Sequence, residues 1–328
     1  MESIILSDDL VPVSNSIVTV GMFDGMHLGH RVIMEYLMAR SEEKQGVSTV
    51  LTFDPHPRVI VQNRRVPLLT SVQERATICR KWGVDRFIVI PFTQAFSKIS
   101  AEKFITDILL DRIGMQEIVV GHDHSFGWGG RGNESLLRSL APKLGFTVDT
   151  IPARIVANSA VSSSRIRTLI EIDGAMRDAN KLLGYEYGID ARVVHGSARG
   201  QEIGFPTANL LPVHPQQILP ANGVYAVRVF LDSETGSRSG MMNIGIRPTF
   251  GESDRTLEVH ILDFDDNLYG QQLRVEFVEK LREERQFEGI ESLVRQLKAD
   301  RERCIESLSN AHVRVASAKK HKRRTRSI

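Results

Sequence analysis

The sequence is poor in the features that define several classes of protein. Only two of its 328 residues are cysteine, Cys79 and Cys304, too few for a disulfide framework or a four-ligand zinc site. No stretch approaches 18 uncharged apolar residues, so no membrane-spanning helix is predicted. Residues 1–10 contain acidic side chains and no basic cluster before an apolar stretch, so no secretory signal is predicted. We therefore expect a cytoplasmic protein.

The chain also lacks a large excess of charge. Its 42 Lys and Arg and 40 Asp and Glu give a net charge of +2. Seven of the basic residues follow Ala311, where there is no acid, so the rest of the chain carries 35 basic and 40 acidic residues, or −5. Residues 311–328 are predicted to be a disordered basic tail, and accessory nucleic-acid binding through this tail is one alternative function.

Length and composition predict an ordinary globular protein of two domains. Hydrophobic residues make up 41% and charged residues 25% of the chain. From residue 17 to 121, β-branched apolar runs alternate with helical patterns about every 30 residues, as in βαβ units. The predicted strands are 17–20, 48–53, 86–90 and 117–120, and the predicted helices are 71–83, 100–114, 133–144 and 163–183.

After Gly184 the pattern changes to runs with strand character separated by turns. Strands are predicted at 187–194, 224–231, 241–246, 257–264 and 273–278, followed by one long helix whose apolar stripe includes Ile290, Leu297, Ile305 and Leu308. The sequence thus predicts an α/β chain. A doubly wound parallel sheet occupies residues 1–183, and an antiparallel β-barrel with a flanking long helix occupies residues 184–310.

The strongest chemical signal is residues 21–30, Gly-Met-Phe-Asp-Gly-Met-His-Leu-Gly-His, directly after a predicted strand and opening a helix. A helix amino terminus at the carboxyl end of a parallel strand offers free N–H groups to phosphate. Gly25 and Gly29 let the backbone approach an anion. His27 and His30 can donate hydrogen bonds to phosphate oxygens and stabilise charge on a leaving pyrophosphate.

Two other interpretations of these residues stay open. The segment could be a glycine-rich turn with two surface histidines. It could also belong to a metal-dependent hydrolase, whose candidate ligands are His27, His30, His56, His122 and His124.

Residues 21–30 resemble the nucleotide-binding signature of the adenylyltransferase superfamily, in the form seen in bacterial bifunctional riboflavin kinase/FAD synthetases. Further segments resemble this family in the same order: 53–57, 96–102, 121–127, 161–167, 204–209, 243–249, 258–264, 268–270 and 281–287. The resemblance covers residues 15–308. Departures from the family pattern are Arg31 where Gln is common, Ser164 where Thr is usual, and His124 at an aromatic position.

The resemblance implies that the amino-terminal domain transfers AMP from ATP to FMN and releases pyrophosphate. His27 and His30 would hold the triphosphate, and Ser163, Ser164 and Arg167 would clamp it from the opposite side. Gly21, Phe23, Gly25, Gly29 and Asp123 complete the implied ATP-binding set, and His56 and Pro57 would line the flavin side. Taken alone, Ser162 to Ser164 could be a helix cap and Asp123 a turn residue.

The second half resembles a riboflavin kinase, which implies phosphorylation of riboflavin with ATP. Glu258 would be the base that accepts the hydroxyl proton, and Thr207 and Asn209 would bind Mg²⁺. His195, Gly196, Arg199 and Gly200 would form a phosphate-covering loop. Arg282, Glu284 and Arg285 either reach the flavin or form a solvated charged turn. The implied partners are riboflavin, FMN, FAD and ATP, with no membrane and no required nucleic acid.

Overall fold

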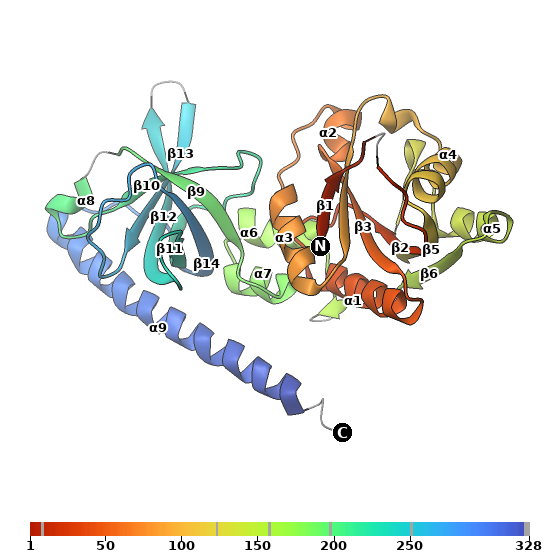
Figure 1. The fold of residues 1–328 in the computed structure, drawn as a ribbon. Coiled ribbons are helices and arrows are strands. Elements are labelled where there is room, and N and C mark those ends of the chain that lie inside the picture. The colour runs from red at the N-terminus through yellow and green to blue at the C-terminus, as the bar shows by residue number, and fades with distance from the viewer. Residues whose placement is uncertain (8–9, 123, 157–158, 197–198, 250–251, 325–328) are drawn as a thin grey trace. The chain divides into compact units, whose positions relative to one another are not determined.

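Figure 1 shows the chain as a computed structural model that describes residues 1–328 except 8–9, 123, 157–158, 197–198, 250–251 and 325–328. The backbone forms two compact units, Met1–Ser163 and Ser164–Ile328. The sequence instead predicts a domain boundary at 183/184. Residues 164–183, which the sequence assigns to the first domain, therefore differ from the prediction in packing with the second unit. The boundary for independent folding stays a prediction.

A six-stranded parallel sheet in the order β1-β4-β3-β2-β5-β6 forms the centre of the first unit. The strands are β1 (Glu2–Ile5), β2 (Ser16–Val20), β3 (Val47–Asp54), β4 (Arg86–Pro91), β5 (Met115–Gly121) and β6 (Thr147–Ile151). β2 to β5 confirm the four predicted strands. The sequence pattern missed the two edge strands, because β1 has no buried residue and β6 has only two.

Helices cover both faces of this sheet (Figure 1), which confirms the predicted doubly wound class. On one face, Leu37 of α1 (Leu28–Glu43) and Cys79 of α3 (Val72–Trp82) are buried against the strands. The other face is covered by α4 (Ala101–Lys103), by the π-helical segment η2 (Phe104–Arg112) that continues it, and by α5 (Glu134–Leu144). Ile105 of η2 and Leu137 of α5 are buried there.

Short elements follow the carboxyl ends of four strands and therefore lie at one edge of the sheet. α2 (Pro57–Gln62) follows β3, η1 (Phe96–Lys98) follows β4, and η3 (Trp128–Gly130) follows β5. The hairpin of β7 (Ile155–Val156) and β8 (Ser159–Ala160) follows β6. This is the edge at which ligands collect in open α/β sheets.

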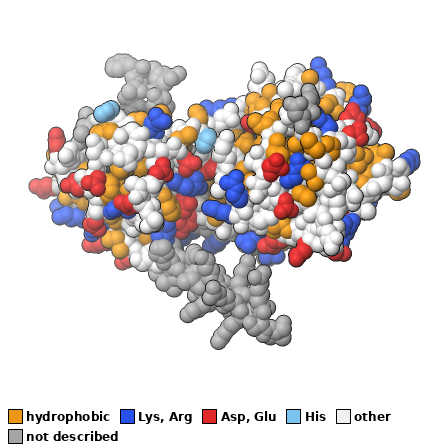
Figure 2. Space-filling model, in the orientation of Figure 1, with side chains coloured by type: hydrophobic (Ala, Val, Ile, Leu, Met, Phe, Trp, Pro, Cys, Tyr) orange, Lys and Arg blue, Asp and Glu red, His pale blue; other side chains and the backbone are white. Residues whose placement is uncertain are grey.

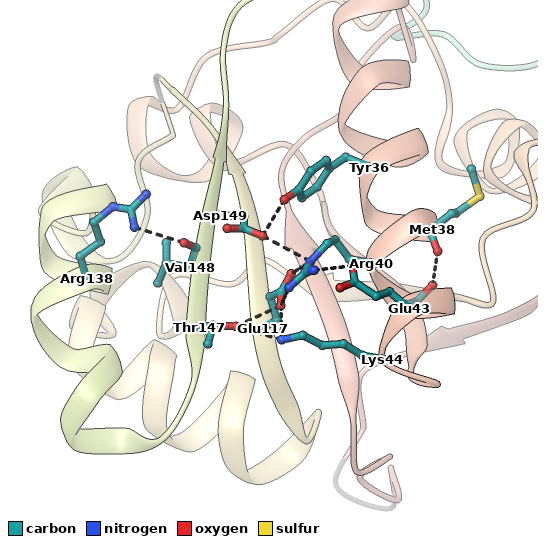
Figure 3. A network of polar contacts seen from close by, with 11 residues as sticks. Tyr36, Met38, Arg40, Glu43, Lys44, Glu117, Arg138, Thr147, Val148 and Asp149 are labelled. Atoms are coloured by element: carbon teal, nitrogen blue, oxygen red, sulfur yellow. Dashed lines mark hydrogen bonds and ion pairs between the residues drawn. The ribbon is translucent and has the colours of Figure 1, made fainter.

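A buried ion network fixes α1 on the sheet (Figure 3). The Glu117 carboxylate of β5 is fully buried and accepts hydrogen bonds from Arg40 Nε at 2.8 Å and Thr147 Oγ1 at 3.0 Å, and it pairs with Lys44. Burial opposes its ionisation, but hydrogen bonds from Arg40, Lys44 and Thr147 outweigh burial and lower the pKa of Glu117 to about 2. The carboxylate is therefore charged at neutral pH.

The second unit contains a closed antiparallel barrel in the order β10-β13-β12-β11-β14-β9. Its strands are β9 (Gly188–Val194), β10 (Ala208–Pro212), β11 (Gly223–Leu231), β12 (Arg238–Thr249), β13 (Glu252–Ile261) and β14 (Gln272–Arg282), and α8 (Arg199–Glu202) lies between β9 and β10. The barrel and five of its strands confirm the prediction. β10 was missed, because Gly204 and Pro206 just before it favour a turn.

Two helices precede the barrel where the sequence predicts one. α6 (Ser163–Glu171) and α7 (Met176–Leu183) are separated at Gly174, which has a φ of +62° and lies against Tyr225 and Lys280 of the barrel. The Asn180 side chain donates to Phe277 O at 2.8 Å and accepts from Tyr187 N–H at 2.8 Å. These contacts explain why residues 164–183 pack with the barrel.

The long helix α9 (Ile290–Arg324) packs against β11, β12 and β14. Leu308 is buried as predicted, and Cys304 is buried too. Ile290 and Ile305 are instead 68% and 41% exposed, and Asp300 is fully buried. The helical backbone continues to Arg324, through most of the tail for which the sequence predicts disorder. This tail segment has neither Gly nor Pro, and extending an existing helix needs no new nucleus.

Within the described residues, no helix is both long enough and apolar enough to cross a membrane.

The packing of α7 predicts that a fragment starting at Ser164 is more stable than one starting at Gly184. Met176, Leu182 and Leu183 are at most 3% exposed, and burying three such side chains contributes on the order of 5 kcal/mol. Thermal melts of fragments 164–310 and 184–310 should therefore show a clearly higher Tm for the longer one. Equal melting temperatures would mean that α6 and α7 do not stabilise the barrel.

Candidate active sites

The histidine loop, residues 21–30, connects the carboxyl end of β2 to the amino terminus of α1. His27 caps α1, and its Nδ1 accepts a hydrogen bond from His30 N–H at 3.3 Å. The two imidazole rings stack 3.6 Å apart at an interplanar angle of 16°. The structure therefore brings the two predicted phosphate-binding histidines together at a helix amino terminus, where backbone N–H groups favour an anion.

Two glycines of this loop lie close to side chains of the loop itself. A Cβ at Gly29 would lie 3.1 Å from the His27 ring, and one at Gly21 would lie 3.0 Å from the Phe23 ring. The Phe23 side chain is only 4% exposed and packs in the core, with its ring edge-on to His30. Its side chain therefore supports the loop. The predicted contact between Phe23 and ATP is untested and would have to involve the Phe23 backbone.

Asp24 anchors the loop and was missed by the sequence analysis. Its buried carboxylate accepts hydrogen bonds from Leu69 N–H at 2.9 Å and Thr70 N–H at 3.0 Å. Gly25 N–H donates to Thr70 Oγ1 at 2.8 Å, and Ser163 Oγ donates to Asp24 O at 2.8 Å. The partners lie 45 residues or more away in sequence, so no local pattern could reveal this role.

Of the predicted triphosphate clamp, the structure places Ser163 beside the histidine loop. Ser164 and Arg167 lie on the part of α6 that belongs to the second unit, so their part in binding ATP stays a prediction. Asp123 lies outside the described residues.

The environment of His30 keeps its imidazole neutral. Burial is the largest cause, and the neighbouring His27 and Arg75 also help to lower the pKa of His30 well below 6.5. Its Nδ1 is buried and has no hydrogen-bond partner among the described residues. His30 can therefore act on phosphate as a neutral hydrogen-bonding group and not through a full charge.

A cavity of about 660 Å³ opens at the same edge of the sheet. Its wall is rich in aromatic side chains and includes Gly21, Met22, Phe53, Pro57, Phe92, Phe96, His124, Phe126 and Trp128. In Figure 2, hydrophobic side chains gather on the visible face of the first unit near α2 and α4. The wall thus contains the predicted flavin residue Pro57 but not His56, which caps α2 by accepting a hydrogen bond from Arg58 N–H at 3.1 Å.

In the barrel, Glu258 lies in a row of polar side chains across three strands. It pairs directly with Asn209 of β10 and with Asn243 of β12. Residues directly opposite on neighbouring antiparallel strands share a face. Because Met241, two residues before Asn243, packs with Cys304 of α9, this face is the outside of the barrel. Asn243 was not among the predicted site residues, although it begins one of the recognised segments.

A second cavity, of about 270 Å³, adjoins this row and includes Gly196, Thr207 and Asn209 in its wall. A Cβ at Gly196 would overlap the Asn209 amide, and one at Gly200 would overlap Phe205 O. The predicted loop glycines are therefore packed against the predicted Mg²⁺-binding segment. His195 stacks on Tyr269 with ring centroids 4.3 Å apart, and the backbone of Arg199 begins α8.

The predicted flavin residues at the end of β14 and just after it form one connected cluster with α9. Arg282 Nε donates to the buried Asp300 Oδ2 at 2.8 Å, and Gln296 links Asp300 to Arg285. Both guanidinium groups lie over the Phe287 ring. The Glu284 carboxylate lies against Gly245, two residues beyond Asn243 on the outer face. Arg282 is therefore held in place, whereas Glu284 and Arg285 are exposed, so for these two both interpretations, a contact with the flavin and a solvated charged turn, stay open.

Among the described residues, no three His, Cys, Asp or Glu side chains come together as a group that could hold a metal ion. His27, His30, His56, His122 and His124 thus form no metal centre in that part of the chain. The hydrolase alternative has no support from the arrangement of these side chains.

Comparisons with known proteins also divide the chain into an amino-terminal and a carboxy-terminal part. Residues 12–165 match the family model described as FAD synthetase, and residues 183–308 match the one described as riboflavin kinase. The sequence is 36% identical to a relative from Listeria monocytogenes, covering 87% of this chain and 90% of the relative. It is 33% identical to one from Bacillus subtilis, covering 90% and 94%, and 33% identical to one from Escherichia coli, covering 88% and 91%. All three are named bifunctional riboflavin kinase/FMN adenylyltransferase.

A crystal structure of a protein named macrolide-efflux protein, from Streptococcus pneumoniae, is also similar. Its TM-score is 0.84 at 29% identity, covering 92% of this chain and 98% of that chain.

A nucleotide-binding parallel sheet followed by a kinase barrel defines a two-domain, ATP-dependent transferase. The chain belongs to the bifunctional riboflavin kinase/FMN adenylyltransferase family. This confirms the family, the enzyme class and the domain order predicted from the sequence.

The neutral, half-buried His30 predicts a loss of stability in mild acid. In the unfolded chain its pKa is about 6.5, whereas in the folded chain it lies well below. Between these values the unfolded state binds more protons, so the stabilisation is complete above about pH 6.5 and falls as the pH drops toward the folded pKa. Urea unfolding should show that His30→Asn reduces this acid slope by up to about 1.4 kcal/mol per pH unit. Parallel pH profiles of wild type and variant would contradict a neutral His30.

The close contact at Gly196 predicts a local effect on the kinase reaction. In Gly196→Ala the new methyl group must displace Asn209 or the loop, and a shift of about 1 Å can reduce a rate about 100-fold. Riboflavin phosphorylation should therefore slow, while FAD formation from supplied FMN is unchanged. Gly289→Ala is the matched control, because a Cβ at Gly289 meets no atom within 4 Å. An equal effect of the two substitutions would argue against the packing of Gly196 on Asn209.

Proposed function

We propose that the first unit carries the adenylyl transfer from ATP to FMN and that the barrel carries the phosphorylation of riboflavin. Two observations support the assignment of sites. The stacked His27 and His30 lie beside an aromatic cavity of about 660 Å³, and Glu258 lies between Asn209 and Asn243 on the outer barrel face. Together they amount to one observation that carries the proposal: each unit has its own polar site, and each site lies at a segment that resembles the family.

In adenylyl transfer, an FMN phosphate oxygen forms the new bond to the α-phosphorus of ATP while the bond to pyrophosphate breaks. No covalent intermediate with the protein is needed, so the side chains orient the reactants and stabilise charge. The helix amino terminus, His27 and the neutral His30 provide donors for the triphosphate. The aromatic cavity suits the flat, apolar flavin ring. Ser164 and Arg167 are proposed to bind the same triphosphate.

In the kinase reaction, the 5′-hydroxyl oxygen of riboflavin forms a bond to the γ-phosphorus of ATP while the bond from that phosphorus to ADP breaks, and the hydroxyl proton leaves. Glu258 is proposed to be the base that accepts that proton. Asn209 and Asn243 flank it and can orient the hydroxyl or the phosphate. Arg282, Glu284 and Arg285 are proposed to contact the flavin, and His195, Gly196, Arg199 and Gly200 to cover the phosphates.

The donor set at the barrel cavity fits Mg²⁺. The Thr207 hydroxyl and the Asn209 amide are neutral oxygen ligands, which suit a small hard cation that also binds phosphate oxygens. When bound, Mg²⁺ would neutralise phosphate charge. We also propose the cytoplasm as the location of the enzyme, because both reactions use ATP and both cysteines are free thiols.

The two reactions should separate by mutation. Glu258→Gln keeps the size of the side chain and removes the base, so FMN formation should slow by about 10² to 10⁴ while FAD formation from FMN stays intact. His27→Ala removes a phosphate donor and should slow only FAD formation, by about 10² to 10³. A chromatographic time course starting from riboflavin or from FMN measures both steps.

Thermal melts establish that each variant is folded. FMN should accumulate in the His27→Ala reaction, whereas riboflavin should persist in the Glu258→Gln reaction. If either substitution slowed both steps equally in a folded protein, the assignment of one site to each unit would be wrong.

A further inference from the structure

Arg75 of α3 is the largest fully buried side chain of the described residues, at 1% exposure. Its Nη1 donates hydrogen bonds to Met22 O at 2.5 Å and to Thr52 Oγ1 at 2.6 Å, and its Nε lies 3.5 Å from Ser71 O. The Thr52 hydroxyl donates to the same Met22 carbonyl at 3.2 Å. Arg75 thus joins the segments after β2, within β3 and before α3.

These contacts place Arg75 where the two halves of the adenylyl-transfer site meet. Met22 belongs to the histidine loop and also lines the 660 Å³ cavity proposed for the flavin. The same guanidinium is close enough to His30 to influence its protonation. A displacement of the Met22 backbone would therefore move the flavin wall relative to His27 and His30.

The helix and the core do not require an arginine at this position. α3 begins at a complete capping box, Ser71 with Glu74, and ends at Gly83 in the left-handed conformation. Among the described residues no carboxylate forms an ion pair with Arg75, so its charge is compensated by a carbonyl, a hydroxyl and the more distant Asp24 and Asp54. Burying such a group is costly, and an apolar residue of similar volume is often more stabilising. A cost of this kind points to a role in the site.

We propose that Arg75 is a positioning residue for adenylyl transfer: it fixes the Met22 backbone and thereby aligns the bound FMN phosphate with the α-phosphorus of ATP. This inference rests on the proposed function of the first unit. Because Arg75 acts on alignment and touches neither substrate, its removal lowers kcat more than it raises the KM for ATP or FMN.

The test uses the full chain and measures kcat and KM of FAD formation from FMN and ATP. Arg75→Met removes the charge at similar length. Arg75→Lys keeps the charge but loses the planar guanidinium, whose Nη1 binds Met22 O and Thr52 Oγ1 and whose Nε lies 3.5 Å from Ser71 O. We expect kcat to fall about 10- to 100-fold in Arg75→Met, with partial recovery in Arg75→Lys. Thr52→Val removes one of the two acceptors and should give a smaller fall, because Met22 O remains.

Arg138 provides the matched control, since it also donates to a backbone carbonyl of the first unit, Val148 O at 3.2 Å, but from α5. Arg138→Met should leave kcat unchanged. Riboflavin phosphorylation by the barrel is the internal readout and should be unaffected in every variant. If Arg75→Met does not fold, Arg75→Lys and Thr52→Val decide the question by the same kcat measurement.

Three results for FAD formation would overturn the proposal: an unchanged kcat in the folded variants, a rise of KM alone, or an equal loss in Arg138→Met. A parallel loss of riboflavin phosphorylation would show general destabilisation and would also overturn it. If wild type failed to form FAD from FMN, the proposed function would fail instead, which keeps the two failures distinct.

Discussion

The first unit depends on how α1 is held at its two ends. At its carboxyl end, Arg40 and Lys44 bind the buried Glu117 of β5. At its amino end, His27 caps the helix, and Asp24 ties the preceding loop to Leu69 and Thr70. Because Glu117 is fully buried, losing either cation leaves charge uncompensated, so the helix has one favourable position on the sheet. The position of α1 in turn determines the position of the stacked histidines, His27 and His30.

The barrel places its site by a different constraint. A small closed barrel fills its interior with apolar side chains, here including Val227, Met242 and Val275, and leaves no room for a ligand. Polar side chains must therefore lie outside, where α9 covers one part of the surface and the row around Glu258 remains beside it. The buried Asp300 of α9 holds Arg282 at the edge of this row, so one helix both completes the core and positions a charged side chain.

The sequence predicted the parts of the sites that depend on local pattern. His27 and His30 are three residues apart at a helix start, so their proximity follows from one turn of helix, and the glycines Gly196 and Gly200 belong to a recognisable loop. Asp24, Arg75 and Asp300 were missed because each acquires its role from partners 18 to 53 residues away. From the local pattern alone, Asp300 would be placed on the solvent-facing side of an amphipathic helix. Strand register, which no local pattern supplies, brings Asn243 to Glu258.

The two proposed sites would bind the same highly charged group, a triphosphate, with largely neutral side chains. At the histidine loop, burial keeps His30 uncharged and the helix amino terminus supplies oriented donors. At the barrel, packed glycines bring backbone close to the neutral oxygens of Thr207 and Asn209. Fixed dipoles bind phosphate without the desolvation cost of a fully buried charge, and they remain oriented when the product leaves. Arg75 differs from these neutral groups, because it is a permanently charged, buried side chain behind the loop. It can hold the Met22 backbone in position without binding the triphosphate so tightly that release becomes slow.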